Sequence, residues 1–209
     1  MWVFLLIVIG IVILTIIEIN KDKDRSQQAS DVMDEFKLWK QTNGLEQITP
    51  KEFSVPGYGI YMFVELEKQK IFFWQSRWET TKLNDEFTEL KTTKFSVDFS
   101  DLLKSEVVIE RDESSKLGNA VVNGAIFGVA GAGAALLSSG DVSSIKVSIY
   151  TKDIIEPLKQ VVIINDILRI GLNVKNDTDK KQKIEEAFDF ANTINATILS
   201  IISKNNEKL

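Results

Sequence analysis

A glycine-rich, uncharged stretch at residues 117–140 (LGNAVVNGAIFGVAGAGAALLSSG) most constrains what this chain can fold into. Small residues recur in it four apart, and this spacing removes bulk from one helix face so that another backbone can approach closely. Three interpretations are open: a transmembrane helix, a dinucleotide-binding loop, or two short helices that form a hairpin. The glycines that we expect to pack closely are Gly124, Gly128, Gly131 and Gly133.

The sequence on either side of this stretch favours the hairpin. Residues 105–112 (SEVVIERD) and 143–151 (SSIKVSIYT) show the alternation of strands. If these strands share a sheet, they lie on one side of any membrane, which excludes a single crossing between them. The dinucleotide-binding pattern G-x-G-x-x-G is incomplete because Leu136 takes the place of the third glycine. We therefore predict a helical hairpin over residues 118–140, either packed within the protein, which is favoured, or re-entrant in a membrane.

The chain begins with a run of large apolar residues, 2–17, which predicts a transmembrane anchor over residues 1–20. No basic residue precedes the run and no small-residue cleavage site follows it, so a signal peptide is disfavoured. Lys21, Lys23 and Arg25 come next, and the positive-inside rule then places the remaining chain in the cytoplasm. We expect a single-pass protein of the cell membrane that contacts the lipid bilayer through this helix. The anchoring side chains would include Trp2, Phe4, Leu6, Ile9, Ile13 and Ile17.

The residue types that are missing restrict the chemistry. The chain has no cysteine and no histidine, which excludes disulfides, thiolate nucleophiles, Cys/His zinc sites and imidazole bases. Its net charge of −5 provides no basic field for nucleic acid. Glu110, Asp112 and Glu113 fit a solvated strand edge, while Asp177 and Asp179 resemble an EF-hand loop that lacks its glycine and its last carboxylate. We predict no catalytic residue, no metal and no cofactor.

The remaining patterns predict an α+β fold. A juxtamembrane helix and linker occupy residues 21–57, with a helix at 26–42 that Asn43 and Gly44 end. A β-rich domain follows over residues 58–204, starting with a hairpin of strands 59–66 and 70–77 and then a polar loop or short helix at 79–91. An amphipathic helix at 181–204 would cover the sheet with its apolar stripe. The other expected strands lie at 92–99, 105–112, 143–151 and 159–165, with a weaker pattern at 167–172.

The order of these segments resembles a group of uncharacterised Firmicute and prophage membrane-anchored proteins with a pleckstrin-homology-like (PH-like) β domain. The likeness covers roughly residues 70–203: a strand-ending turn at 99–107, the glycine-rich stretch 118–140, a strand and Glu156-Pro157, and a terminal helix with Ala187, Ala191 and Ala196. It implies an antiparallel PH-like sheet or barrel closed by the C-terminal helix. The basic residues that follow the hairpin in that group are missing here, and the group provides no activity or functional residue to transfer.

Three hypotheses of function follow. The first is a membrane-anchored, non-enzymatic interaction module, of bacterial or prophage origin, that binds a membrane or envelope protein. The second, which rests on the prophage resemblance, is a host-protection factor that excludes superinfecting phage. The third is a membrane-perturbing protein that acts through the glycine-rich stretch.

Overall fold

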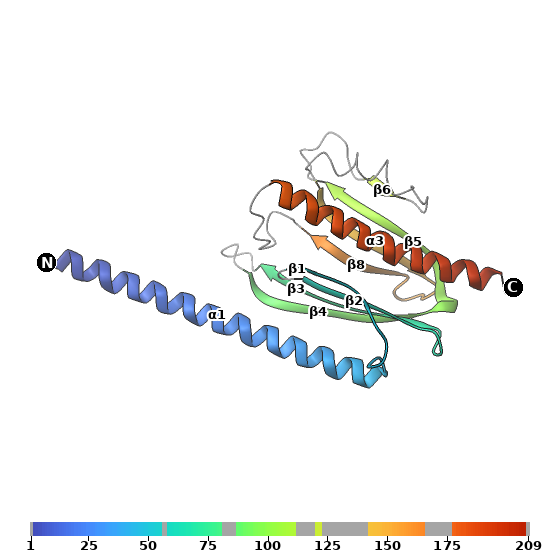
Figure 1. Ribbon diagram of the computed structural model, residues 1–209, viewed down its shortest axis with the longest axis horizontal. Helices are drawn as coiled ribbons and strands as arrows, with labels where there is room; N and C mark the ends of the chain where they lie inside the picture. The colour runs from blue at the N-terminus through green and yellow to red at the C-terminus, as the bar shows by residue number, and fades with distance from the viewer. Residues whose placement is uncertain are drawn as a thin grey trace. The chain divides into compact units, whose positions relative to one another are not determined.

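The computed structural model describes residues 2–55, 58–80, 87–111, 120–122, 142–165 and 177–207. These residues form an α+β protein with two antiparallel four-stranded sheets and two α-helices (Figure 1). The chain divides into two compact units. One comprises Met1–Glu46 with Trp78–Lys91, and the other comprises Gln47–Arg77 with Thr92–Leu209.

The first unit contains helix α1, which spans Trp2–Asn43. The helix ends as its sequence predicts: Gly44 takes a left-handed φ of 67°. Its N–H donates to the Gln41 carbonyl over 3.0 Å, and the Leu45 N–H donates to the Lys40 carbonyl over 2.9 Å. This pair of hydrogen bonds satisfies carbonyls that the end of a helix otherwise leaves without a partner.

The expected membrane anchor is wrong. Over the stretches of chain that the structure describes, no helix has both the length and the apolar character needed to cross a bilayer. The helix itself continues without a break through Lys21, Lys23 and Arg25 to Asn43, so the separate anchor and juxtamembrane helix are one element. The single-pass localisation in the cell membrane, inferred from that anchor, is corrected accordingly.

The first sheet consists of β1 (Lys51–Val55), β2 (Tyr58–Glu65), β3 (Lys70–Thr80) and β4 (Phe87–Asp98), in that order. The predicted hairpin is confirmed, because β2 and β3 pair in antiparallel register with Met62 opposite Phe73. Strand β1 was not expected. Residues 87–91 belong to β4, where the polar sequence predicts a loop or a short helix. Phe87 and Leu90 alternate with polar neighbours less regularly than in the strands that the sequence reveals.

The second sheet has the order β6-β5-β7-β8, with β5 spanning Leu102–Arg111, β7 Val142–Thr151 and β8 Leu158–Asn165. These three strands confirm the sequence pattern. The helical hairpin is wrong at Ala120–Val122, which form strand β6 against β5, with Val122 opposite Val107. β-branched valines suit this pairing better than a helix. The close-packing glycines Gly124, Gly128, Gly131 and Gly133, like the weak strand at 167–172, lie outside the described residues.

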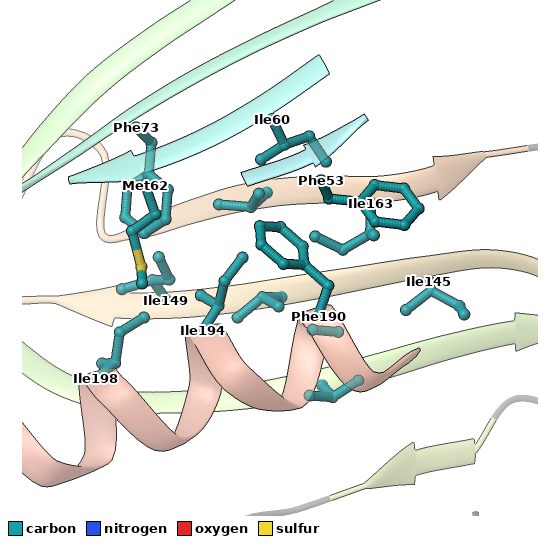
Figure 2. Close-up of a cluster of buried hydrophobic side chains, with 14 of the residues drawn as sticks. Phe53, Ile60, Met62, Phe73, Ile145, Ile149, Ile163, Phe190, Ile194 and Ile198 are labelled. Carbon is teal, nitrogen blue, oxygen red and sulfur yellow. The ribbon is translucent and has the colours of Figure 1, made fainter. Parts of the chain in front are cut away.

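Helix α3 (Asp177–Asn206) supplies the core of the second unit together with both sheets. Its predicted apolar stripe is confirmed: Ile184, Ala187, Ala191, Ile194 and Ile198 are all buried. Figure 2 shows Phe190, Ile194 and Ile198 pointing from the helix toward strands of the two sheets. The ring of Phe190 stacks on that of Phe53 in β1, with 5.5 Å between ring centroids.

Candidate interaction site

The side chains singled out in the sequence do not assemble into one site. The expected anchor residues Trp2, Phe4, Leu6, Ile9, Ile13 and Ile17 lie on the first turns of α1. Asp177 and Asp179 begin α3, so they belong to a helix and form no cation-binding loop. Asp112 and Glu113 fall outside the described residues.

Glu110 lies in a polar cluster on the face of β5 and β7 that points away from the core. Its carboxylate accepts a hydrogen bond from Ser144 Oγ over 2.6 Å and forms an ion pair with Lys146 Nζ over 2.7 Å. These hydrogen bonds, first from Lys146 and then from Ser144, hold the pKa of Glu110 below its usual range. The predicted solvated edge is therefore a paired cross-strand network, in which each strand supplies a partner for the other.

Glu106, farther along β5 on the same face, is the most enclosed carboxylate of this network. Its side chain is only 7% exposed. Lys104 Nζ donates to one carboxylate oxygen over 2.5 Å, and Tyr150 Oη donates to the other over 2.6 Å. Burial opposes the ionisation of Glu106, but the hydrogen bonds from Lys104 and Tyr150 outweigh it, so its pKa lies below the usual range. The hydrogen bond to Glu106 raises the pKa of Tyr150 in turn.

This network is organised for stability and not for proton transfer. A general acid or base needs a pKa near the working pH, whereas both carboxyl groups are held more firmly ionised than usual. Each carboxylate is occupied by a lysine of its own face. Within the described stretches, no group of three or more acidic side chains is arranged to hold a metal ion. The outer face of the second sheet is therefore a poor candidate for a catalytic site.

A different feature of the second unit is suited to binding. Ile154 and Ile155, in the loop between β7 and β8, are 95% and 94% exposed. Isolated apolar side chains on a surface are ordinary, but a contiguous apolar patch rimmed by polar groups marks an interaction site. The other exposed large apolar side chains described in this unit lie in or beside the connections at the same end of the fold: Leu66, Leu103 and Leu158.

Hydrogen bonds within the chain support the loop that carries the two isoleucines, which we call the β7–β8 tip (residues 152–157). The side chain of Asp153 accepts hydrogen bonds from the N–H groups of Ile155 and Glu156, over 2.9 and 3.1 Å. These two donors, with Glu156 first, lower the pKa of Asp153. The Thr151 N–H donates to the Pro157 carbonyl over 2.8 Å and closes the base of the loop. The tip is thus an aspartate-stabilised turn that presents its isoleucines without needing to reorganise.

The tip is also fastened to the connection between the two sheets. This connection is the short helix η1 (Phe99–Asp101). The Lys152 N–H donates to the Asp101 carbonyl over 2.9 Å, and its ammonium donates to the Ser100 carbonyl over 2.6 Å. On the other side of η1, the Asn205 amide donates to the Phe99 carbonyl over 2.7 Å, which ties down the end of α3.

A pocket of about 480 Å³ opens beside the tip. Figure 1 shows that the β2–β3 turn, the β4–β5 connection, the β7–β8 loop and the C-terminal end of α3 meet at this end of the second unit. Gln69, in the turn, adopts a left-handed φ of 54° and its carbonyl accepts the Phe99 N–H over 2.8 Å. The side chains that line the pocket are both apolar and polar: Phe99, Leu102, Leu103 and Ile202, with Gln69, Asp98, Ser100, Lys152, Asn205 and Asn206.

Sequence reasoning missed this site, which we call the apolar end and define by the β7–β8 tip, the pocket and the exposed leucines Leu66, Leu103 and Leu158. One signal was present: two isoleucines stand between Asp153 and Glu156-Pro157, where a turn usually carries polar residues. The pocket left no comparable signal, because its walls come from four separate segments of the chain.

The architecture defines the protein as an α+β protein with two antiparallel sheets and a C-terminal helix. No protein family, curated protein or solved structure matches the chain.

Proposed function

We propose that this chain is a non-enzymatic interaction module that binds a partner protein through the apolar end. The observation that carries the proposal is the exposure of Ile154 and Ile155 on a turn that hydrogen bonds hold in place. Leaving two adjacent isoleucines in water is unfavourable, by about 1.5–3 kcal/mol for each side chain relative to its burial. A partner that covers them recovers this free energy.

The chemistry of the chain supports binding over catalysis. It has no histidine and no cysteine, and the enclosed carboxylates described above are paired with lysines. The polar groups around the apolar end include both signs of charge, as with Lys70 and Asp98, which lie 3.4 Å apart. Such a polar rim around an apolar centre is typical of protein–protein interfaces.

We also propose that the two sheets and α3 form a PH-like domain. The support is an antiparallel four-stranded sheet, followed along the chain by a second sheet and a helix that packs on both. Phage exclusion and membrane perturbation stay as alternative hypotheses. They rest on the prophage resemblance and on the glycine-rich stretch, and no contact among the described residues favours either of them.

A pull-down with the tagged chain of 209 residues tests the proposed function. We expect a partner protein to be recovered by the wild type and lost with the double variant Ile154→Asp/Ile155→Asp. The matched control is Leu38→Asp, which changes an exposed apolar residue on α1. Both variants should keep the wild-type circular dichroism and melting temperature, because exposed side chains contribute little to stability. Equal recovery of the partner by all three proteins would contradict the proposal, as would recovery of the bait alone by a chain that is also monomeric in solution.

A further inference from the structure

The apolar end carries a protrusion and a hollow side by side. Ile154 and Ile155 project from the β7–β8 tip, and the pocket next to them has an apolar wall that includes Phe99, Leu103 and Ile202. We propose that the pocket of one copy of the chain receives the Ile154–Ile155 tip of a second copy, so that two copies pair reciprocally. This inference rests on the proposed function and names the partner as a second copy of the same chain.

The positions of the two features favour a two-fold pairing. A symmetric dimer uses the same patch on both subunits, so every protrusion needs its matching hollow within that one patch. Here Lys152 belongs to both features: it is the first residue of the tip and it lines the pocket. The tip does not fill the pocket of its own chain, because both isoleucines are almost fully exposed. A second copy, turned by half a rotation, brings each tip to the other pocket.

The size and rigidity of the two features suit insertion. The pocket of about 480 Å³ falls within the ~300–1,000 Å³ range of sites that enclose a small ligand, which leaves room for two branched side chains. The turn that presents the isoleucines is already formed by the Asp153 and Thr151 hydrogen bonds. A preformed loop loses less conformational entropy on binding than a flexible one.

The charges around the tip favour a protein surface over an anionic bilayer. Lys152 and Lys159 are balanced by Asp153 and Glu156, and Lys159 forms ion pairs with both of these acidic residues. Surface attachment to anionic lipid requires an excess of lysine and arginine around the apolar side chains. The tip and its neighbour Lys159 together have no such excess. These four side chains also bring no net charge into the pocket of a second copy, which one lysine and one aspartate line, Lys152 and Asp98.

Cysteine cross-linking tests the pairing directly, because the chain has no cysteine of its own. One variant carries Ile155→Cys at the tip, and a second carries Leu103→Cys at the pocket. The two variants are mixed under mild oxidation, and the control mixture replaces Leu103→Cys by Leu38→Cys. We expect the 155–103 disulfide to form at least about tenfold faster than the 155–38 disulfide. A tenfold ratio corresponds to a free-energy difference of ~1.4 kcal/mol in favour of the paired arrangement. Sedimentation equilibrium of the wild-type chain should show a monomer–dimer equilibrium. The double variant Ile154→Asp/Ile155→Asp should raise the dissociation constant of the dimer by at least about tenfold.

The pairing is overturned if the wild-type chain sediments as a monomer throughout the concentration range, or if the 155–103 disulfide forms no faster than the control. The failure of this inference remains distinct from failure of the proposed function. If the wild type is monomeric but a different protein is recovered in an isoleucine-dependent manner, the interaction module stands and only the self-pairing is rejected. If the isoleucines instead govern sedimentation with anionic phosphatidylserine vesicles, the pairing is again rejected, in favour of a lipid surface.

Discussion

The hydrogen bond from Tyr150 to Glu106 provides a quantitative test of how the second sheet is stabilised. Tyr150→Phe removes the hydroxyl that donates to Glu106 over 2.6 Å and keeps the ring. A hydrogen bond to a charged group contributes ~1.5–3 kcal/mol. We expect a loss near the lower end, about 1.5 kcal/mol, because Glu106 keeps its hydrogen bond from Lys104 when the Tyr150 hydroxyl is removed.

A double-mutant cycle in urea measures this contribution. It compares the free energy of unfolding of the wild type, Tyr150→Phe, Glu106→Ala and the double variant at pH 7. If the hydrogen bond accounts for the loss, Tyr150→Phe should destabilise the wild type by about 1.5 kcal/mol but have little effect once Glu106 is alanine. A coupling energy within the ~0.5 kcal/mol error of additive sites would refute the reasoning.

The dependence on pH provides an independent check of the same bond. The folded-state pKa of Glu106 lies below its usual range, so ionised Glu106 stabilises the fold above the unfolded-state pKa of about 4.3. That stability is lost as the pH falls through the folded-state pKa. Removing the Tyr150 hydroxyl raises the folded-state pKa of Glu106 toward its usual range. The difference between wild type and Tyr150→Phe should therefore be full at pH 7 and shrink below about pH 4.3; a difference that stays constant down to pH 3 would show that the carboxylate is not involved.

Two further predictions concern the fold. Phe190→Ala should destabilise the second unit by about 3–5 kcal/mol, because the loss of the ring that stacks on Phe53 leaves a cavity between α3 and β1. Thermal unfolding measures this loss of stability, and a loss below about 1 kcal/mol would mean that the helix repacks. Gly44→Ala should destabilise the end of α1 by about 1–2 kcal/mol, because alanine is disfavoured at a φ of 67°. Hydrogen exchange of the amides in the last turn of α1 should accelerate, and Thr42→Ala, at an exposed position, serves as the control. Equal exchange rates in both variants would contradict the predicted backbone strain.

Local patterns in the sequence predicted those elements whose cause is local. Asn43-Gly44 ends α1 because only a glycine takes a left-handed conformation without cost. The β2–β3 hairpin follows from two alternating apolar runs that a short turn joins. The stripe on α3 follows from the spacing of its isoleucines and alanines at three and four residues.

Errors arose where a segment was judged without its neighbours. The apolar start of the chain resembles an anchor when it is read alone, but it is continuous with a charged helix. Ala120–Val122 belong to a stretch rich in glycine and alanine that is typical of a close-packed helix, yet these three residues, two of them valines, pair with the edge of β5 as a strand. An edge strand leaves a row of N–H and C=O groups unpaired, and pairing them outweighs a weak local preference.

The amino-acid sequence by itself determined the α+β class, the strands β5, β7 and β8, the C-terminal helix and the exclusion of cysteine and histidine chemistry. Only the tertiary structure decided the candidate site. The site combines the β2–β3 turn, η1 with the start of β5, the tip with the start of β8, and the end of α3. These four segments are far apart along the chain and meet at one end. The reason is physical: periodicity reports which face of an element is buried, but a pocket depends on which ends of separate elements the packing of the core brings together.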